Sequence, residues 1–490
     1  MKSKTTVLAV ILLAIAATVG CGSNGHVILP PNGGNYSNAS LKGSYVYQVH
    51  GFDTNGNPYR QIGVFTADGN GNITGGTDDS SANASGIQVS GTYTVGKDGT
   101  GFIAINTSLG ALNWAITLTS TAQVQLIEAD NFANARGTAE FQPPSAIAAT
   151  LNGTYVFRLH QEASAQNGGS QTPAAEVGSL TISGNSASGS MDENVAGTFS
   201  SATNISATFN APAGLGRGTG TLVNSSTNFT TNFVYYIVDT NRFVMLVTNF
   251  GAVGSGSAEL QSGNVGAGLS GNYAFGSRGD DGSFFAGIAA VGQFSASSGV
   301  ISGTEDISQD GNIFNSVAIS SCYTASGNGR VVVTSASGGA CTGTITQVFW
   351  MVSPGRAFFV DAGTSTVEDG TADLQTASNF GLSTFAQQYS MAMDGIDATP
   401  ELLSRVGVLQ FDGKGNVKLN EVANASSSGI GTNNPGIMAG TYTVGSNGRI
   451  VTTFGGGSLD LVMYPVSASQ VYALQTDAGT TTSGQVLLQQ

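Results

Sequence analysis

A short segment near the start of the chain returns along the sequence, and this repetition constrains the fold more than any other feature. The segment reads LKGSYVY at 41–47, LNGTYVF at 151–157, LSGNYAF at 269–275 and, more weakly, LSTF at 382–385. Each stretch closes with small residues and a glutamine, at Gln142, Gln261, Gln375 and Gln489. Repeats of this length indicate a tandem array. We therefore expect four β modules, at 41–142, 151–261, 269–375 and 380–490.

The first module has the pattern of successive short β-strands. Runs rich in Thr, Val, Ile and aromatic residues alternate with hairpin-turn sequences such as Asn55-Gly56 and Asp98-Gly99. The strands are expected at 44–52, 59–67, 72–77, 87–95, 101–106, 112–119, 123–129 and 137–141. Eight strands joined by short turns predict an antiparallel meander, and closing it into a barrel removes its exposed edges.

The predicted fold class is therefore all-β, with four tandem antiparallel meander β-barrel modules. Tandem two-sheet β-sandwiches of immunoglobulin type are the alternative, but hairpin turns after nearly every strand favour the meander over Greek-key connections. A barrel of this size either fills with side chains or holds one small ligand. The bulk of Tyr45, Tyr47, Phe65, Tyr93 and Trp114 favours a filled interior in module 1.

The composition excludes several classes of protein. Hydrophobic residues supply 40% of the 490 residues, which is enough for a core, and only 9% are charged. Disordered chains combine low hydrophobicity with high charge, so disorder is not expected. With 16 basic and 30 acidic residues the net charge is −14, which argues against a nucleic-acid-binding surface.

The amino terminus has the pattern of an export signal. An apolar run at 7–19 follows two lysines, and it is too short to span a membrane comfortably. Because the run stops at Gly20-Cys21 and continues into an uncharged polar segment, residues 1–20 resemble a bacterial lipoprotein signal peptide. The resemblance implies cleavage before Cys21 and a diacylglyceryl group on its thiol. Residues 21–40 would then be a lipid-anchored flexible tether.

The residue after the cysteine bears on localisation. Gly22 replaces the aspartate that marks inner-membrane retention in lipoproteins. The resemblance therefore implies a cell-envelope protein anchored to the outer membrane, on the periplasmic face or at the cell surface. The alternative is an ordinary signal peptide in which Cys21 has no role.

The modules also carry a weak family likeness. The L-x-G-x-Y opening, the GTYT strand at 91–94 and the eight-strand meander together resemble the calycins, the lipocalin-like and avidin-like barrels. Trp usually follows the glycine in those families, whereas this chain has Tyr45, Tyr155, Tyr273 and Phe385. An avidin-type biotin site is therefore not implied. The tandem array is also similar to β-rich lipoproteins of environmental bacteria.

Two further cysteines, Cys322 and Cys341, lie in the third module. In an oxidising compartment such a pair predicts a disulfide bond, with two free thiols as the alternative. A metal site is disfavoured, because two cysteines without neighbouring histidines cannot complete a tetrahedral set of ligands.

Few polar residues are candidates for chemistry. His50 and His160 occupy equivalent positions opposite the module tyrosines, so both are expected in solvent if the tyrosines face the core. Acidic residues recur on the third strands, and neighbours there point to opposite faces of the sheet. We expect these acids to be solvated charges, and a shared ligand or cation contact is the alternative. They are Asp78 and Asp79, Asp192 and Glu193, Glu305 and Asp306, and Glu421.

Three loops, at 53–57, 68–72 and 412–416, carry oxygen ligands at alternate positions, as calcium loops do. Hairpin turns with glycine explain the same residues, and we expect turns.

The sequence favours a non-enzymatic, surface-anchored lipoprotein with a structural, adhesion or recognition role. No catalytic triad or paired-histidine zinc spacing can be assembled. We expect no cofactor, no metal and no nucleic-acid partner. The membrane is the expected partner through the lipid anchor. A glycan, a small apolar ligand or a surface protein are the further candidates, and binding of an apolar ligand or glycan by the barrels is the alternative function.

Overall fold

The computed structural model describes residues 36–163, 172–280, 287–336, 341, 343–377, 379–396, 401–426, 429–431, 438–455 and 459–490. They belong to one compact unit, Pro31–Gln490. The predicted signal peptide, Cys21 and most of the predicted tether lie outside the described residues. No helix in the described part is long and apolar enough to cross a membrane.

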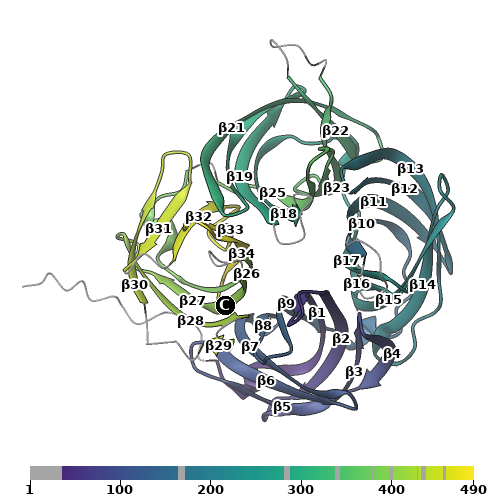
Figure 1. The fold of residues 1–490 in the computed structure, drawn as a ribbon, viewed down its shortest axis with the longest axis vertical. Coiled ribbons are helices and arrows are strands. Elements are labelled where there is room, and N and C mark those ends of the chain that lie inside the picture. Colours follow the sequence, from purple (N-terminus) through teal and green to yellow (C-terminus); the bar gives the residue numbers. More distant parts are fainter. Residues whose placement is uncertain are drawn as a thin grey trace, which may run out of the picture. The chain divides into compact units, whose positions relative to one another are not determined.

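Barrel 1 is built from the first nine strands (Figure 1). Strand β1 pairs with β2 on one side and with β9 on the other, and every pairing is antiparallel. Because β2 also pairs with β3, the barrel closes, and β4 folds back onto β3. The strands are β1 (Lys42–Asp53), β2 (Pro58–Asp68), β3 (Asn72–Ser80), β4 (Asn83–Gln88), β5 (Ser90–Val95), β6 (Thr100–Thr107), β7 (Gly110–Ser120), β8 (Gln123–Glu128) and β9 (Ala133–Gln142).

Barrels 2 and 3 each close with eight strands in chain order. Barrel 2 consists of β10 (Gly153–Ala163), β11 (Pro173–Ser183), β12 (Ser186–Val195), β13 (Thr198–Phe209), β14 (Arg217–Asn224), β15 (Phe229–Asp239), β16 (Arg242–Val247) and β17 (Ala252–Leu260). Barrel 3 consists of β18 (Gly271–Asp280), β19 (Gly287–Ser297), β20 (Val300–Gln309), β21 (Asn312–Ala325), β22 (Arg330–Ser335), β23 (Ile345–Ser353), β24 (Arg356–Asp361) and β25 (Val367–Leu374).

Barrel 4 repeats the plan of barrel 1, with a short extra strand, β29, on β28. Its strands are β26 (Gln388–Ile396), β27 (Leu402–Phe411), β28 (Asn416–Ala425), β29 (Gly429–Gly431), β30 (Met438–Val444), β31 (Ile450–Phe454), β32 (Asp460–Pro465), β33 (Gln470–Gln475) and β34 (Thr481–Leu488). Short 3₁₀ turns precede or connect strands at η1 (Asn38–Ser40), η2 (Pro144–Ala146), η4 (Gly214–Gly216), η5 (Val265–Ala267) and η6 (Leu382–Phe385).

The predicted fold class is confirmed: the chain forms four closed eight-stranded antiparallel meander barrels. The sandwich alternative is wrong, because the first and last strands of every module pair with each other. This pairing leaves one continuous sheet curled around each core instead of two sheets facing one another.

The tyrosine of the opening segment closes one end of each barrel. The Tyr45 hydroxyl donates to the Thr121 carbonyl, in the turn between β7 and β8, at 2.6 Å. Tyr155 and Tyr273 make the same contact with the Thr240 and Pro354 carbonyls. The glycine two residues earlier is required because its φ is positive, +111° at Gly43, and a Cβ there would lie 2.7 Å from the Phe141 ring.

The fourth module departs from the predicted alignment. Phe385 was expected to take the place of the tyrosine, but it belongs to η6, before the first strand. The true counterpart is Tyr389, which pairs across β27 and β34 as Tyr45 pairs across β2 and β9, and donates to the Ala468 carbonyl. The weak LSTF match concealed this shift, because in the true register Phe385 takes the place of the opening leucine.

The interior of barrel 1 is filled, as the bulk of its aromatic residues predicted. Tyr45, Tyr47, Phe65 and Trp114 are each at most 1% exposed. The rings of Tyr47 and Trp114 meet edge to face, with centroids 4.9 Å apart.

The closing glutamine of each module joins its barrel to another one. Gln142 Nε2 donates to the Leu215 and Ile237 carbonyls of barrel 2, and Gln261 Nε2 donates to the Asn328 and Met351 carbonyls of barrel 3. Gln375 reaches the Pro465 carbonyl of barrel 4. Gln489 then reaches the Asp98 and Leu118 carbonyls of barrel 1, so the contacts form a closed cycle.

A buried aspartate strengthens three of these four junctions. At the junction of barrels 1 and 2, Asp79 is fully buried and accepts hydrogen bonds from Arg217 Nε and Nη2 at 2.8 Å and from the Tyr236 hydroxyl at 2.6 Å. Such paired, hydrogen-bonded burial is the condition under which a carboxylate is tolerated inside a protein. The equivalent triads are Asp192 with Arg330 and Trp350, and Asp306 with Arg449 and Tyr464.

The third-strand acids are therefore not solvated, and that prediction was wrong. Neighbouring acids do point to opposite faces: Asp79 faces barrel 2, whereas Asp78 faces the interior of barrel 1 and accepts from Tyr47 and Gln61. Burial raises the pKa of Asp78 to about 6 and that of Glu305, which faces the interior of barrel 3, to about 7. The sequence could not show that these acids are shielded from solvent, because the shielding depends on contact between barrels.

The triads predict a strong dependence of stability on charge pairing. Replacing Arg217 in the Arg217→Met variant leaves the buried Asp79 carboxylate without its cation, which costs about 3 kcal/mol or more. The double variant Asp79→Asn with Arg217→Met recovers part of this loss, because no buried charge remains. Urea denaturation of the variants measures both effects, and Lys414→Met at an exposed position is the control. A double variant no more stable than Arg217→Met would contradict the interpretation.

Candidate functional site

The two barrel histidines lie where the barrels meet. His50 on β1 and His160 on β10 are opposite the tyrosine faces of their strands, as predicted, but they are not in solvent. Their side chains are only 19% and 15% exposed. The expectation failed because the outer faces of the first strands are covered by neighbouring barrels instead of water.

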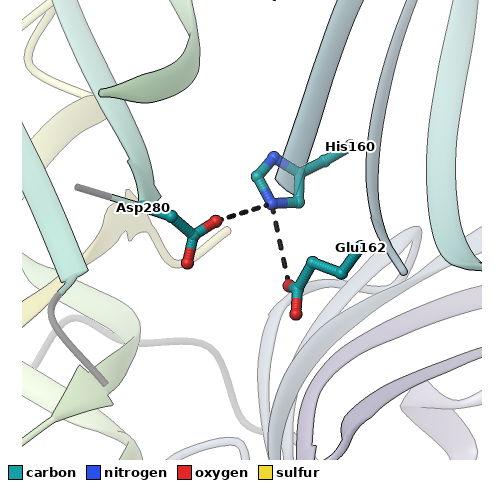
Figure 2. A group of neighbouring side chains, drawn as sticks. All are labelled: His160, Glu162 and Asp280. Atoms are coloured by element: carbon teal, nitrogen blue, oxygen red, sulfur yellow. Dashed lines mark ion pairs between the residues drawn. The ribbon is translucent and has the colours of Figure 1, made fainter. Parts of the chain in front are cut away.

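His160 lies at the centre of a cluster of carboxylates (Figure 2). We call His160, Glu162, Asp280 and Asp369 the His160 cluster. His160 Nδ1 is 2.8 Å from Asp369 Oδ1, and Nε2 is 3.5 Å from Asp280 Oδ2 and 3.8 Å from Glu162 Oε1. Strands β10, β18 and β25 supply these residues, so the cluster spans barrels 2 and 3.

Two arginines neutralise part of this negative charge. Arg60 of barrel 1 donates to Glu162 Oε1 at 2.9 Å, and Arg158 Nε lies 3.2 Å from Asp369 Oδ2. Burial by itself would lower the pKa of His160, but the contacts with Asp280 and Asp369 outweigh burial and raise the pKa to about 9. His160 is therefore a cation at neutral pH and completes the balance of charge.

Glu162, Asp280 and His160 present ligand atoms within 4.8 Å of one another, close enough to hold a metal ion. The chemistry of the cluster favours ion pairs instead. His160 would have to lose its proton, and Glu162 already accepts from Arg60. We therefore interpret the cluster as an electrostatic connection between barrels.

A second cluster surrounds Asp394 of barrel 4. Its carboxylate accepts from Arg136 Nε of barrel 1 at 2.7 Å and from Arg278 Nη1 of barrel 3 at 3.0 Å. Although burial opposes ionisation, these arginines hold the pKa of Asp394 well below its usual range. His50 Nε2 is 3.5 Å from Asp394, but burial and then repulsion from Arg278 lower the pKa of His50 to about 3. His50 is consequently neutral, unlike His160.

These clusters border a cavity of about 510 Å³ lined by residues of all four barrels. Six arginines line it, namely Arg60, Arg136, Arg158, Arg242, Arg278 and Arg356. Each makes an ion pair with a carboxylate; Arg242 and Arg356, for example, both pair with Glu259. All six arginines are therefore paired, and none of these six is a free cation. Their ion pairs help to hold the barrels together.

Sequence reasoning missed the arginines as a class. Arg217, Arg330 and Arg449 each follow a glycine at the same position of a module. In a chain with only 16 basic residues, that recurrence was a signal for a shared role. Their partners could not be found from the sequence, because each aspartate lies on a different barrel more than 100 residues away.

The loops that resemble calcium sites are turns, as expected. Asp68 Oδ1 accepts from the backbone N–H groups of Asn70 and Asn72, which is the hydrogen bonding of an aspartate-capped turn. Asp412 makes the same contacts with Lys414 and Asn416. The side chains are thus committed to the backbone of their own loops.

Cys322 and Cys341 form a disulfide bond in the structure, with Cα atoms 5.4 Å apart. Cys322 is on β21 and Cys341 lies between β22 and β23, so the bond links β21 to the segment that follows its neighbouring strand.

Barrel 3 also contains an interior cavity. Its volume is about 250 Å³, and it is lined by four phenylalanines together with Glu305 and Asp361. The phenylalanines are Phe275, Phe294, Phe349 and Phe359.

Comparisons with known proteins add little beyond this geometry. No family model and no curated protein matches the chain. Among solved structures, intact Ap-TbpB, with its N and C lobes, is 8% identical and has a TM-score of 0.19, covering 77% of this chain and 86% of that one. Transferrin-binding protein B of Neisseria meningitidis serogroup B is 8% identical, with a TM-score of 0.19, and covers 77% of this chain and 82% of that one.

A mutant transferrin-binding protein B of Haemophilus parasuis Hp5 has a TM-score of 0.19 at 7% identity, covering 74% of this chain and 82% of that one. TM-scores this low carry no argument about function. The four closed eight-stranded barrels themselves fit the description of calycin-like barrels.

The His160 cluster predicts a stability that falls at alkaline pH. The pKa of His160 is raised from 6.5 to about 9 in the folded protein, so its contribution is complete below about 6.5 and is lost as the pH rises through 9. The His160→Gln variant should therefore melt below the wild type at pH 6, and the difference should shrink towards pH 10. Thermal melting across this range measures it.

Zinc provides a check on the same interpretation. At pH 7, added Zn²⁺ should change the melting temperature of the wild type no more than it changes that of His160→Gln. A zinc-dependent stabilisation confined to the wild type would show that the cluster is a metal site and not a set of ion pairs.

Proposed function

We propose that the chain is a non-enzymatic, lipid-anchored protein of the cell envelope whose four barrels act as one structural and recognition body. One observation carries the proposal: the residues that define the repeat are used to plug the barrels and to join them. The tyrosines close barrel ends, and the closing glutamines and the Arg–Asp pairs connect successive barrels. A rigid array of this kind presents loops at fixed positions, which suits recognition at a surface.

The anchor rests on the sequence. Residues 1–20 act as the signal peptide, Cys21 carries the lipid, and residues 21–40 tether the barrels to the outer membrane. In this arrangement the membrane is a partner of the protein, and it binds the amino-terminal end through the lipid.

Exposed apolar side chains on turns support a recognition role. Phe250, between β16 and β17, is 89% exposed, and Leu109, between β6 and β7, is 65% exposed. Phe229, at the start of β15, is 56% exposed. Aromatic side chains at loops are favourable contacts for a glycan or a surface protein, because they add contact area with little loss of side-chain entropy.

The anchor is tested in cells that acylate lipoproteins. The chain should incorporate labelled palmitate and partition into detergent, whereas Cys21→Ser should do neither. Cys322→Ser, which keeps Cys21, is the matched control and should retain the label. An unlabelled wild-type chain released into the medium would contradict the proposed anchor.

The cavity of barrel 3 favours a second candidate, carriage of a small apolar ligand. Its four phenylalanines offer an apolar wall, although about 250 Å³ is slightly below the ~300 Å³ of usual ligand sites. Glu305 and Asp361 also line it, and burial raises the pKa of both carboxyls. At least part of the cavity wall is therefore uncharged at mildly acidic pH.

Carriage predicts saturable binding of an uncharged apolar dye such as Nile red. Ile319→Phe, which adds a ring at the cavity wall, should weaken dye binding by about tenfold. Val195→Phe on the outside of barrel 2 is the control and should change nothing. Absent dye binding by the wild type, or equal binding by Ile319→Phe, removes this candidate.

A further inference from the structure

The junction between barrels 4 and 1 lacks the triad found at the other three. Strand pairing identifies the equivalent positions: Thr100 pairs with Thr117 as Arg217 pairs with Tyr236. Val422 pairs with Val406 on β27 as Asp79 pairs with Ile62 on β2. Val422 thus takes the place of the acid, Thr100 that of the cation, and Thr117 that of the aromatic donor.

These smaller side chains leave a cavity where the other junctions are filled. Its volume is about 440 Å³, within the range of small-molecule sites. We call it the 4–1 cleft. The three replaced positions, Thr100, Thr117 and Val422, all line it, together with Thr94, Phe102 and Asn420.

A buried hydroxyl in the 4–1 cleft has no hydrogen-bond partner. Thr117 is fully buried, and its Oγ1 is unpaired. At the equivalent position of the other junctions, the Tyr236 hydroxyl, the Trp350 N–H and the Tyr464 hydroxyl all donate to an aspartate. An unpaired buried hydroxyl costs free energy that a bound polar group would recover.

The cleft is not a consequence of loose docking between the two barrels. Thr119 Oγ1 and Ser390 Oγ are 2.7 Å apart across the junction, and Asn424 Nδ2 donates to the Glu128 and Ala133 carbonyls at 2.9 and 3.1 Å. Gln489 adds its two bonds to barrel 1. These contacts hold the two barrels together around the cleft.

We propose that the 4–1 cleft binds an uncharged sugar of one or two rings. Thr94 and Thr117 offer hydroxyl groups that match the hydroxyls of a sugar, and the Thr100 hydroxyl, which donates to Asp98 Oδ1, can still accept a hydrogen bond. Asn420 Nδ2 donates to Asp98 Oδ2 across the junction. Phe102 is 51% exposed and lies in the cleft wall, where its ring can stack on the apolar face of a pyranose. The inference deepens the recognition role proposed above and rests on it.

The wall disfavours other ligand classes. Glu421 is the charged residue in the lining, and Arg405 pairs with it, so neither a free anion nor a free cation finds an unmatched charge there. A wholly apolar ligand would leave the Thr117 hydroxyl unpaired.

The test rebuilds the missing triad. The triple variant Thr100→Arg, Thr117→Tyr and Val422→Asp gives this junction the residues found at the other three, so it should fold and fill the cleft. An array of uncharged oligosaccharides identifies the sugar that the full-length wild type binds, and saturation-transfer NMR measures its affinity. The triple variant should bind that sugar about tenfold more weakly or not at all, with an unchanged or higher melting temperature.

Phe102→Ala keeps the cleft open but removes the stacking surface, and it should weaken binding by about tenfold. Phe250→Ala, at an exposed loop of barrel 2, is the matched control and should bind as the wild type does. A blank array for the wild type, or equal sugar binding by a folded triple variant, would overturn the inference. Neither result affects palmitate labelling at Cys21, so a failure of the envelope anchor remains distinguishable.

Discussion

At three of the four junctions, the relative positions of neighbouring barrels depend on the burial of an aspartate between them. Asp79, Asp192 and Asp306 are each fully buried, and each accepts from an arginine and an aromatic donor of the next barrel. A buried carboxylate without these partners would cost folding free energy. A bidentate arginine satisfies the carboxylate only in one geometry. Small shifts between these barrels are therefore penalised.

Strand alternation lets one short segment serve both the barrel and the junction. In barrel 1, Asp78 faces inward to Tyr47 and Gln61, while the next residue, Asp79, faces outward to Arg217. The tyrosine and the glutamine divide the same two tasks, since Tyr45 closes its own barrel and Gln142 reaches the next one. The repeat is thus a unit of assembly as much as a unit of folding.

The junction of barrels 4 and 1 joins modules that are not consecutive in the chain. It keeps the glutamine contact through Gln489 but has Thr100, Thr117 and Val422 in place of the charged triad. The other junctions use their space for arginine and an aromatic ring, whereas this one retains a cavity. One repeated plan therefore yields three filled junctions and one that is open to a ligand.

The sequence by itself determined the four repeats, most of the strands and turns, the antiparallel meander and the side of each strand on which Tyr45 and His50 lie. These follow from local periodicity and turn chemistry, which act over a few residues. The strand predicted at 87–95 is instead divided between β4 and β5. Only the tertiary structure decided that His50, His160 and Asp79 are covered, and which charged residues they meet. Outward-facing residues show the same alternation whether water or another barrel covers them, so contacts such as Asp192 with Arg330, 138 residues apart, are decided by packing alone.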